Sequence, residues 1–258
     1  MTSASGYLLV FADSTSFHGP GQVEPPTEPK LHPNVCARHL GPDVAVDLVA
    51  RPGMTARDAW WALTKDPVVW GVELPRATGI LLSVGHMDQL PAALPTWLRE
   101  GIAYVRPGWL RRRVRRTYLG TAPTIIRASG GRLAQLPTAA TQRYLSRMVD
   151  AIRVFRPDVP IVRHLPGPYD SDRYPSQRHH ADAVEAAAAW CVRQGVGSVP
   201  MDDLVGADLA AGLNNVDGMH WGWDTHDRIG RATADAFVRA GWPAVTTVGE
   251  SEAVPQAQ

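Results

Sequence analysis

LLVFADSTSFHGP (residues 8–20) is a continuous apolar run that ends abruptly in polar residues and turn formers. Runs of this kind are typical of strands buried on both faces, as in a parallel sheet. The run begins at residue 7, and four further runs bounded by Gly, Pro or Asp follow it, at residues 44–50, 79–84, 159–163 and 196–201. The sequence therefore predicts a central parallel sheet.

Longer segments with helical periodicity lie between these runs, at residues 34–40, 55–65, 92–106, 140–155, 181–194 and 224–240. Alternation of strands and helices predicts an α/β fold, a three-layer α/β/α sandwich with right-handed crossovers. The chain has 258 residues, enough for one full core. We expect a single domain over residues 1–245, with an inserted segment at about 107–140 and a disordered tail at 246–258.

The composition, with 45 % hydrophobic and 20 % charged residues, is that of a globular protein and excludes a disordered one. Two distant cysteines argue against a disulfide scaffold or a thiolate-rich zinc site, and they suit a reducing compartment. The N-terminus lacks the features of a signal peptide. No apolar stretch approaches the ~20 residues that span a bilayer. We expect a cytoplasmic protein without a transmembrane segment, a metal or a cofactor.

One segment departs from the overall charge balance. Residues 101–149 (the Arg-rich segment) contain ten Arg and no Asp or Glu, although the whole chain has a net charge of only +1. The segment is interpreted either as the solvated face of an inserted helical hairpin or as a surface that gathers phosphates and carboxylates. Under the second interpretation Arg111, Arg112 and Arg115 bind substrate. Near-neutral overall charge argues against nucleic acid.

Ser14 follows the first apolar run directly, so its hydroxyl is expected at the carboxyl edge of the sheet, where a nucleophile would stand. The alternative is that Asp13 and Ser14 only cap the next helix. Far along the chain, Asp217 and His220 stand three residues apart in DGMH. A serine needs a general base, and a carboxylate can orient the histidine that acts as one. Together the three residues predict a catalytic triad.

Four short blocks that contain these residues occur in the order found in the SGNH (GDSL-type) hydrolase superfamily, which the chain resembles. The blocks are ADSTS with Ser14, RPGMT with Gly53, VGHMD with Gly85, and DGMH with Asp217 and His220. The resemblance implies a flavodoxin-like sandwich and a Ser14–His220–Asp217 triad. It also implies that the backbone N–H groups of Ser14 and Gly53 bind the oxyanion, together with an asparagine side chain.

Two residues depart from the superfamily pattern. Ala12 replaces the usual Gly before Asp–Ser, and Met87 replaces the asparagine that donates to the oxyanion. Loss of one such donor typically raises a barrier by ~2.7–4 kcal/mol. Either another group, such as His86, supplies the donor, or the reaction is less demanding than ordinary ester hydrolysis. Met87 would also make this wall of the site apolar, which suits an acyl chain.

Within the superfamily, the chain resembles the actinobacterial diglucosylglycerate octanoyltransferases. The similarity lies in ADSTSFHGP, GMTARDAWWALTKDP, GHMDQLP, YVRPGWLRRRVRR and DGMHWGWDTH. It implies transfer of octanoyl from octanoyl-CoA to a sugar hydroxyl of diglucosylglycerate, a precursor of methylglucose lipopolysaccharide. The alternatives are a carboxylic ester hydrolase (esterase or deacetylase) with the same triad, and a binding protein that lost activity.

Such a transferase takes an acyl-CoA donor and an acidic glucoside acceptor, and both can use arginines. Besides the three arginines, the candidate substrate-binding residues are His18, Gly85, His86, Met87, Trp221 and Trp223. Trp221 and Trp223 follow the candidate base directly and are predicted to be walls of the site. The sequence does not indicate whether the protein is a monomer or an oligomer.

Overall fold

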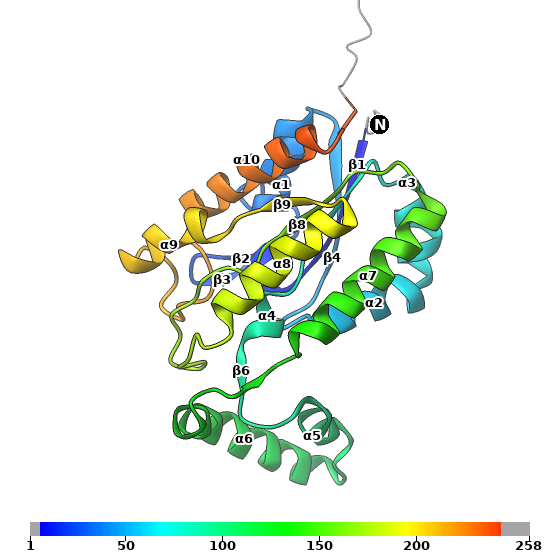
Figure 1. Ribbon diagram of the computed structural model, residues 1–258. Helices are drawn as coiled ribbons and strands as arrows, with labels where there is room; N and C mark the ends of the chain where they lie inside the picture. Colours follow the sequence, from blue (N-terminus) through cyan, green and yellow to red (C-terminus); the bar gives the residue numbers. More distant parts are fainter. Residues whose placement is uncertain (1–5, 244–258) are drawn as a thin grey trace, which may run out of the picture.

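The computed structural model describes residues 6–243 and contains a five-stranded sheet in the order β4-β1-β5-β8-β9 (Figure 1). Every neighbouring pair in this sheet is parallel. The strands are β1 Gly6–Ala12, β4 Val44–Ala50, β5 Gly79–Ser83, β8 Ile161–His164 and β9 Gly197–Val199. These match the five apolar runs, so the predicted central parallel sheet is confirmed.

Helices cover both faces of the sheet and complete the three-layer α/β/α sandwich that was predicted (Figure 1). One layer consists of α2 Ala56–Lys65, α7 Thr138–Phe155 and α8 His180–Gln194. The other consists of α1 His32–Leu40, α9 Asp202–Ala210 and α10 Trp223–Arg239. Along β1, Leu9 and Phe11 pack in the first core and Leu8 and Val10 in the second, as the two-residue period of a strand requires.

Shorter elements occupy the connections between the main strands and helices. They are η1 Ser14–Ser16, β2 His18–Gly19, β3 Gln22–Val23, η2 Val69–Glu73, α3 Leu74–Arg76 and α4 His86–Gln89. The strands β2 and β3 form a two-stranded antiparallel hairpin directly after η1. Most of these elements follow a strand of the main sheet, so they lie at the edge where chemistry is expected in an open α/β fold.

The helix predicted over residues 92–106 is wrong. The chain there forms β6 Pro91–Ala92, a short α5 Thr96–Gly101 and the 3₁₀ turn η3 Ile102–Tyr104. Pro95 prevents a helix from running through residues 92–95, because a proline disfavours helical dihedrals in the residue before it. Pro107 then separates η3 from the next helix.

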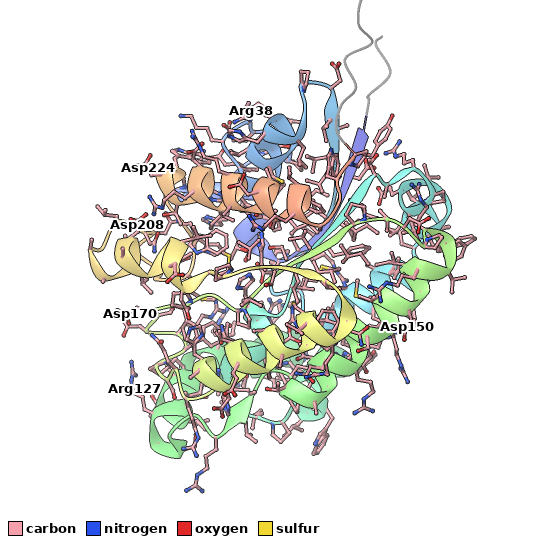
Figure 2. All side chains as sticks on the ribbon, turned by 45° about the horizontal axis from the view of Figure 1, so that its top comes forward. Arg38, Arg127, Asp150, Asp170, Asp208 and Asp224 are labelled. Carbon is pink, nitrogen blue, oxygen red and sulfur yellow. The ribbon has the colours of Figure 1, made fainter. Side chains whose placement is uncertain are left out.

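The Arg-rich segment contributes a 22-residue helix, α6 Gly108–Ser129, to a helical insertion between β6 and β7 Leu133–Ala134. Because β6 and β7 pair antiparallel, α5, η3 and α6 project from one end of the sandwich (Figure 1). Arg127 near the end of α6 forms an ion pair of 3.5 Å with Asp172 in the loop after β8. Figure 2 shows Arg127 on the same side of the molecule as Asp170 of that loop.

Two further sequence predictions concern the C-terminal tail and membrane-spanning helices. The predicted tail at residues 246–258 lies outside them. Among residues 6–243, no helix combines the length and the apolar character that a membrane span requires.

Candidate active site

Ser14 stands at the first position of η1, immediately beyond the carboxyl end of β1. The preceding residue, Asp13, is fully buried, and its Oδ1 accepts hydrogen bonds from the backbone N–H (2.9 Å) and hydroxyl (2.7 Å) of Thr15. Asp13 therefore caps the turn, as the alternative interpretation proposed. The cap holds Ser14 at the sheet edge without occupying the Ser14 hydroxyl.

His220 comes from the loop before α10, and Asp217 from the same tight turn. The Ser14 hydroxyl is 2.9 Å from His220 Nε2, and His220 Nδ1 is 2.5 Å from Asp217 Oδ2. Since Asp217 accepts from the Nδ1 proton, Nε2 is left as the acceptor that faces Ser14. The structure thus brings together the three residues predicted as a triad, in hydrogen-bonding order.

Glycine at position 218 makes this turn possible. Gly218 has φ +66°, and a Cβ there would lie 1.5 Å from the carbonyl oxygen of Asp170. Its own carbonyl accepts from the Asp170 N–H at 2.9 Å. The loop after β8 therefore presses directly against the turn, and only glycine fits between Asp217 and the triad histidine.

The electrostatics of the turn favour an ionised Asp217. Partial burial would raise the pKa of this carboxyl, but hydrogen bonds from the His220 side chain and from the N–H groups of His220 and Met219 outweigh burial and lower it. The two backbone bonds are 3.1 and 2.9 Å long. Asp217 is thus a carboxylate at neutral pH and can stabilise a positive charge on His220.

His18, a predicted substrate-binding residue, lies directly on the triad. Its ring is stacked on that of His220, with centroids 3.9 Å apart and planes 18° from parallel. His18 Nδ1 donates to the carbonyl of Gly19 at 2.8 Å. The side chain of Asn215 joins the same hairpin to the His220 loop through Gly19 (3.1 Å) and Gly21 (3.0 Å). Sequence reasoning did not single out Asn215, although only Val216 separates it from the DGMH block.

Gly53 lies in the loop between β4 and α2, next to the Ser14 turn. Its neighbour Arg51 donates its backbone N–H to the carbonyl of Ala12 at 3.3 Å. Gly53 has φ +70°, and a Cβ there would be 3.8 Å from Met87 Cε. The position where the superfamily has an asparagine is therefore filled by an apolar side chain in contact range of Gly53.

The loop that carries Met87 is anchored by its neighbours. Gly85 adopts φ +115° as the N-cap of α4. Asp88 is buried and accepts from the N–H of Ala56 (3.2 Å) and from the hydroxyl of Thr141 (2.9 Å). Burial raises the pKa of Asp88 to about 6, although those hydrogen bonds oppose the shift. Asp88 joins this loop to the start of α2 and to α7.

His86, the residue suggested as a replacement donor, is hydrogen-bonded through only one of its ring nitrogens. It is buried, and its Nδ1 accepts from the backbone N–H of Gly167 at 2.9 Å. Its Nε2 is buried without a hydrogen-bond partner among residues 6–243. Burial lowers the pKa of His86 and keeps the ring neutral. Within residues 6–243, His86 thus hydrogen-bonds only to the loop after β8, and its ring lies near those of His164 and Trp221.

The two tryptophans after His220, which were predicted to be walls of the site, lie in different surroundings. Trp221 is only 3 % exposed and packs in the core between the sheet and α10. Trp223 starts α10 and covers the β2–β3 hairpin, where a Cβ on Gly19 would come within 2.5 Å of its ring. Both side chains support the elements that carry His18 and His220.

Sequence reasoning missed a group of buried histidines beneath the triad. His32 Nε2 is 2.8 Å from the Ser16 hydroxyl, and the His32 backbone N–H donates to His226 Nδ1 at 3.2 Å. His226 Nε2 in turn donates to the carbonyl of His18 at 3.2 Å. Burial lowers the pKa of His226 to about 4 and that of His32 as well, so both are neutral. No sequence pattern links these residues, because they lie on separate helices and meet only in the fold.

Residues of α6 in the helical insertion line two neighbouring cavities. The first, of about 340 Å³, reaches Gly53 and Met87 and is walled on the other side by α6 residues Tyr118, Leu119, Ala122 and Ile126. The second is a groove of about 520 Å³ between α5–η3 and α6. It contains the predicted Arg111, Arg112 and Arg115, together with Arg99, Ile102, Ala103, Tyr118 and Leu119.

No protein-family model matches the chain. Solved structures share its fold at low identity, and they include a lipase/acylhydrolase from Enterococcus faecalis (13 % identical, 90 % of this chain and 94 % of that chain, TM-score 0.59). TesA is similar (14 % identical, 91 % and 99 % covered, TM-score 0.57). A psychrotrophic esterase, EstA from Pseudoalteromonas sp., also aligns (12 % identical, 91 % and 98 % covered, TM-score 0.56).

Two curated proteins are much more similar in sequence. A diglucosylglycerate octanoyltransferase of Mycobacterium tuberculosis is 39 % identical over 237 residues, which cover 92 % of this chain and 94 % of the relative. One of Mycolicibacterium hassiacum is also 39 % identical, over 92 % of this chain and 96 % of the relative. These similarities confirm the resemblance drawn from the sequence blocks. The chain belongs to the family of the diglucosylglycerate octanoyltransferases, on the fold of the SGNH hydrolases.

Proposed function

We propose that this protein transfers an octanoyl group from octanoyl-CoA to a sugar hydroxyl of diglucosylglycerate, in the cytoplasm and during methylglucose lipopolysaccharide biosynthesis. Two relatives at 39 % identity are named diglucosylglycerate octanoyltransferases, which supports the octanoyl group and the acceptor. The observation that carries the proposal is the hydrogen-bonded chain from the Ser14 hydroxyl through His220 to Asp217. The reaction needs no cofactor besides the donor.

In the first half-reaction, Ser14 attacks the thioester carbonyl while His220 Nε2 accepts the hydroxyl proton. The resulting oxyanion is bound by the backbone N–H groups of Ser14 and Gly53. The C–S bond then breaks, CoA leaves as a thiol with the proton from His220, and octanoyl remains as an ester on Ser14. Asp217 stabilises the imidazolium during these steps.

In the second half-reaction, the sugar hydroxyl takes the place of CoA. His220 accepts its proton, the sugar oxygen attacks the Ser14 ester, and the proton returns to the Ser14 oxygen as it leaves. The apolar Met87 supplies no hydrogen bond to the oxyanion. A thioester donor offsets this deficit in the first half-reaction, because a thiolate leaves more readily than the alkoxide of an ordinary ester.

An SGNH carboxylic ester hydrolase is the second candidate, and it is favoured by the fold shared with lipases and esterases. The same triad would serve, with water as the acceptor. The two functions are separated by incubating the protein with octanoyl-CoA, with and without diglucosylglycerate, and measuring free CoA and octanoylated glucoside. Acceptor-dependent CoA release with stoichiometric product supports transfer. Release that is indifferent to the acceptor contradicts it.

A further inference from the structure

One face of α6 changes character along its length. Arg111, Arg112 and Arg115 lie on the N-terminal half of this face and line the groove of about 520 Å³. On the C-terminal half, Ala122 and Ile126 line the cavity of about 340 Å³ that reaches Gly53 and Met87. The same side of one helix thus leads from guanidinium groups to the oxyanion side of the triad.

The groove and the cavity are adjacent, since Arg99, Tyr118 and Leu119 line both of them. Tyr118 and Leu119 supply an apolar surface at the junction. A ligand that occupies both spaces would therefore carry negative charge at one end and a slender, less polar arm at the other.

The arginines of the groove are free of acidic neighbours. Within residues 6–243, no carboxylate lies within 4.0 Å of Arg111, Arg112 or Arg115, whereas Arg57 and Arg127 in the surroundings each have one. The Arg-rich segment itself contains no Asp or Glu. Uncompensated guanidinium groups that converge on one groove are typical of phosphate recognition.

We propose that this groove is the phosphate subsite for the acyl donor, binding the phosphate groups of coenzyme A while the pantetheine arm follows Tyr118 and Leu119 toward Ser14. The inference rests on the proposed function. The single carboxylate of diglucosylglycerate is the other anion that could bind the arginines. A small polyhydroxylated acceptor, however, would leave the apolar surface of Tyr118 and Leu119 without an apolar partner. Several phosphates on a long arm match both the number of arginines and the shape of the path.

The chain offers a matched control on the same helix. Arg113 and Arg116 are exposed and line neither the groove nor the cavity. The double variant Arg112→Ala/Arg115→Ala and the control Arg113→Ala/Arg116→Ala therefore remove the same charge from α6. Arg112 and Arg115 make no hydrogen bond with residues 6–243, so their loss is not expected to unfold the helix.

The first measurement compares octanoyl-CoA with octanoyl-pantetheine, which lacks the phosphates. We expect KM for octanoyl-CoA to rise at least tenfold in Arg112→Ala/Arg115→Ala, because the variant loses the charge-assisted hydrogen bonds of two guanidinium groups to phosphate. The preference for octanoyl-CoA over octanoyl-pantetheine should largely disappear in this variant. The control variant should keep both KM values within about twofold of the wild type.

The second measurement is calorimetric binding of CoA itself, which needs no turnover. Loss of CoA affinity in Arg112→Ala/Arg115→Ala, and not in the control, supports the subsite. Equal affinities in the two variants overturn it, and so does a rise in KM for diglucosylglycerate in place of that for octanoyl-CoA. If the wild type transfers no octanoyl group to any acceptor, the proposed function fails, while the binding result still decides the subsite.

Discussion

The imidazole of His18 lies flat on that of His220, with ring centroids 3.9 Å apart. The stacked ring covers one face of the triad histidine, and its own position is fixed by a hydrogen bond from Nδ1 to Gly19. His18 thereby restricts the orientations in which His220 can reach Ser14. This relationship makes His18 a positioning residue for the proposed reaction and leads to the first prediction.

Replacing His18 by Ala should lower kcat about tenfold, because the unsupported His220 ring samples orientations outside hydrogen-bonding distance of Ser14. His18→Phe keeps a flat ring at this position and should recover most of the loss. Steady-state kinetics of the two variants, with melting temperatures to exclude unfolding, test this role. Equal activity of the Ala and Phe variants would argue that the stack is unimportant.

Ser14→Ala should abolish octanoyl transfer and labelling by a fluorophosphonate probe, a loss of at least about 10³-fold. Ser16→Ala is the matched control, since Ser16 lies on the same turn but bonds the buried His32. This variant should keep probe labelling and lose about 1–2 kcal/mol of unfolding free energy. Mass spectrometry of the labelled protein identifies the nucleophile. Labelling that survives in Ser14→Ala would contradict the assignment.

Asp217→Asn should reduce kcat about 10²–10⁴-fold, because an amide does not stabilise the imidazolium. The pKa of Asp217 is lowered in the folded protein, so its contribution to stability is present above the ordinary aspartate pKa of ~4 and is lost as the pH falls through the lower folded value. The difference in melting temperature between wild type and variant should therefore shrink between about pH 5 and pH 2. A difference that grows on acidification would contradict this sign.

The opposite pH dependence is expected for Asp88, whose pKa burial raises to about 6. The folded state binds this proton more tightly than the unfolded state, so stability falls as the pH rises from about 4 to 6 and is level above that. Asp88→Asn, which keeps one oxygen for Thr141 or Ala56, should remove this component. Urea unfolding across the pH range measures it, and an unchanged profile in the variant would contradict the shift.

Met87→Asn tests whether the missing oxyanion donor matters. It places an amide where the superfamily has one, beside Gly53, and should raise cleavage of an oxygen ester such as p-nitrophenyl octanoate about 10-fold or more. Met87→Leu is the control for a change of shape without a donor, and it should show no gain. If neither variant gains esterase activity, the oxyanion is already fully bound by other groups.

The strands and the triad could be predicted because short stretches of adjacent residues indicate them. The apolar run up to Ala12 ends in Asp13–Ser14, and a buried parallel strand places whatever follows it at the carboxyl edge. Gly218 likewise marks a turn in which Asp217 can reach the nearby His220. In both places, the geometry follows from residues adjacent in the chain.

Other features depended on contacts between distant elements, and here prediction was less successful. The expected helix over 92–106 was replaced by β6, α5 and η3, and the apolar period there did not reveal the pairing of β6 with the distant β7. Trp221 and Trp223 are two residues apart, so the sequence treated them alike. In the fold Trp221 is buried against α10, while Trp223 covers Gly19.

By itself, the sequence determined the five strands of the main sheet, the fold class and the three residues of the triad, because each depends on periodicity or on a short block. Tertiary structure alone decided that His18 stacks on His220, that His86 turns to Gly167, and that α6 joins its arginines to the cavity beside Met87. These relationships join residues far apart along the chain. Their distances are set by how the layers pack, and no local pattern encodes that packing.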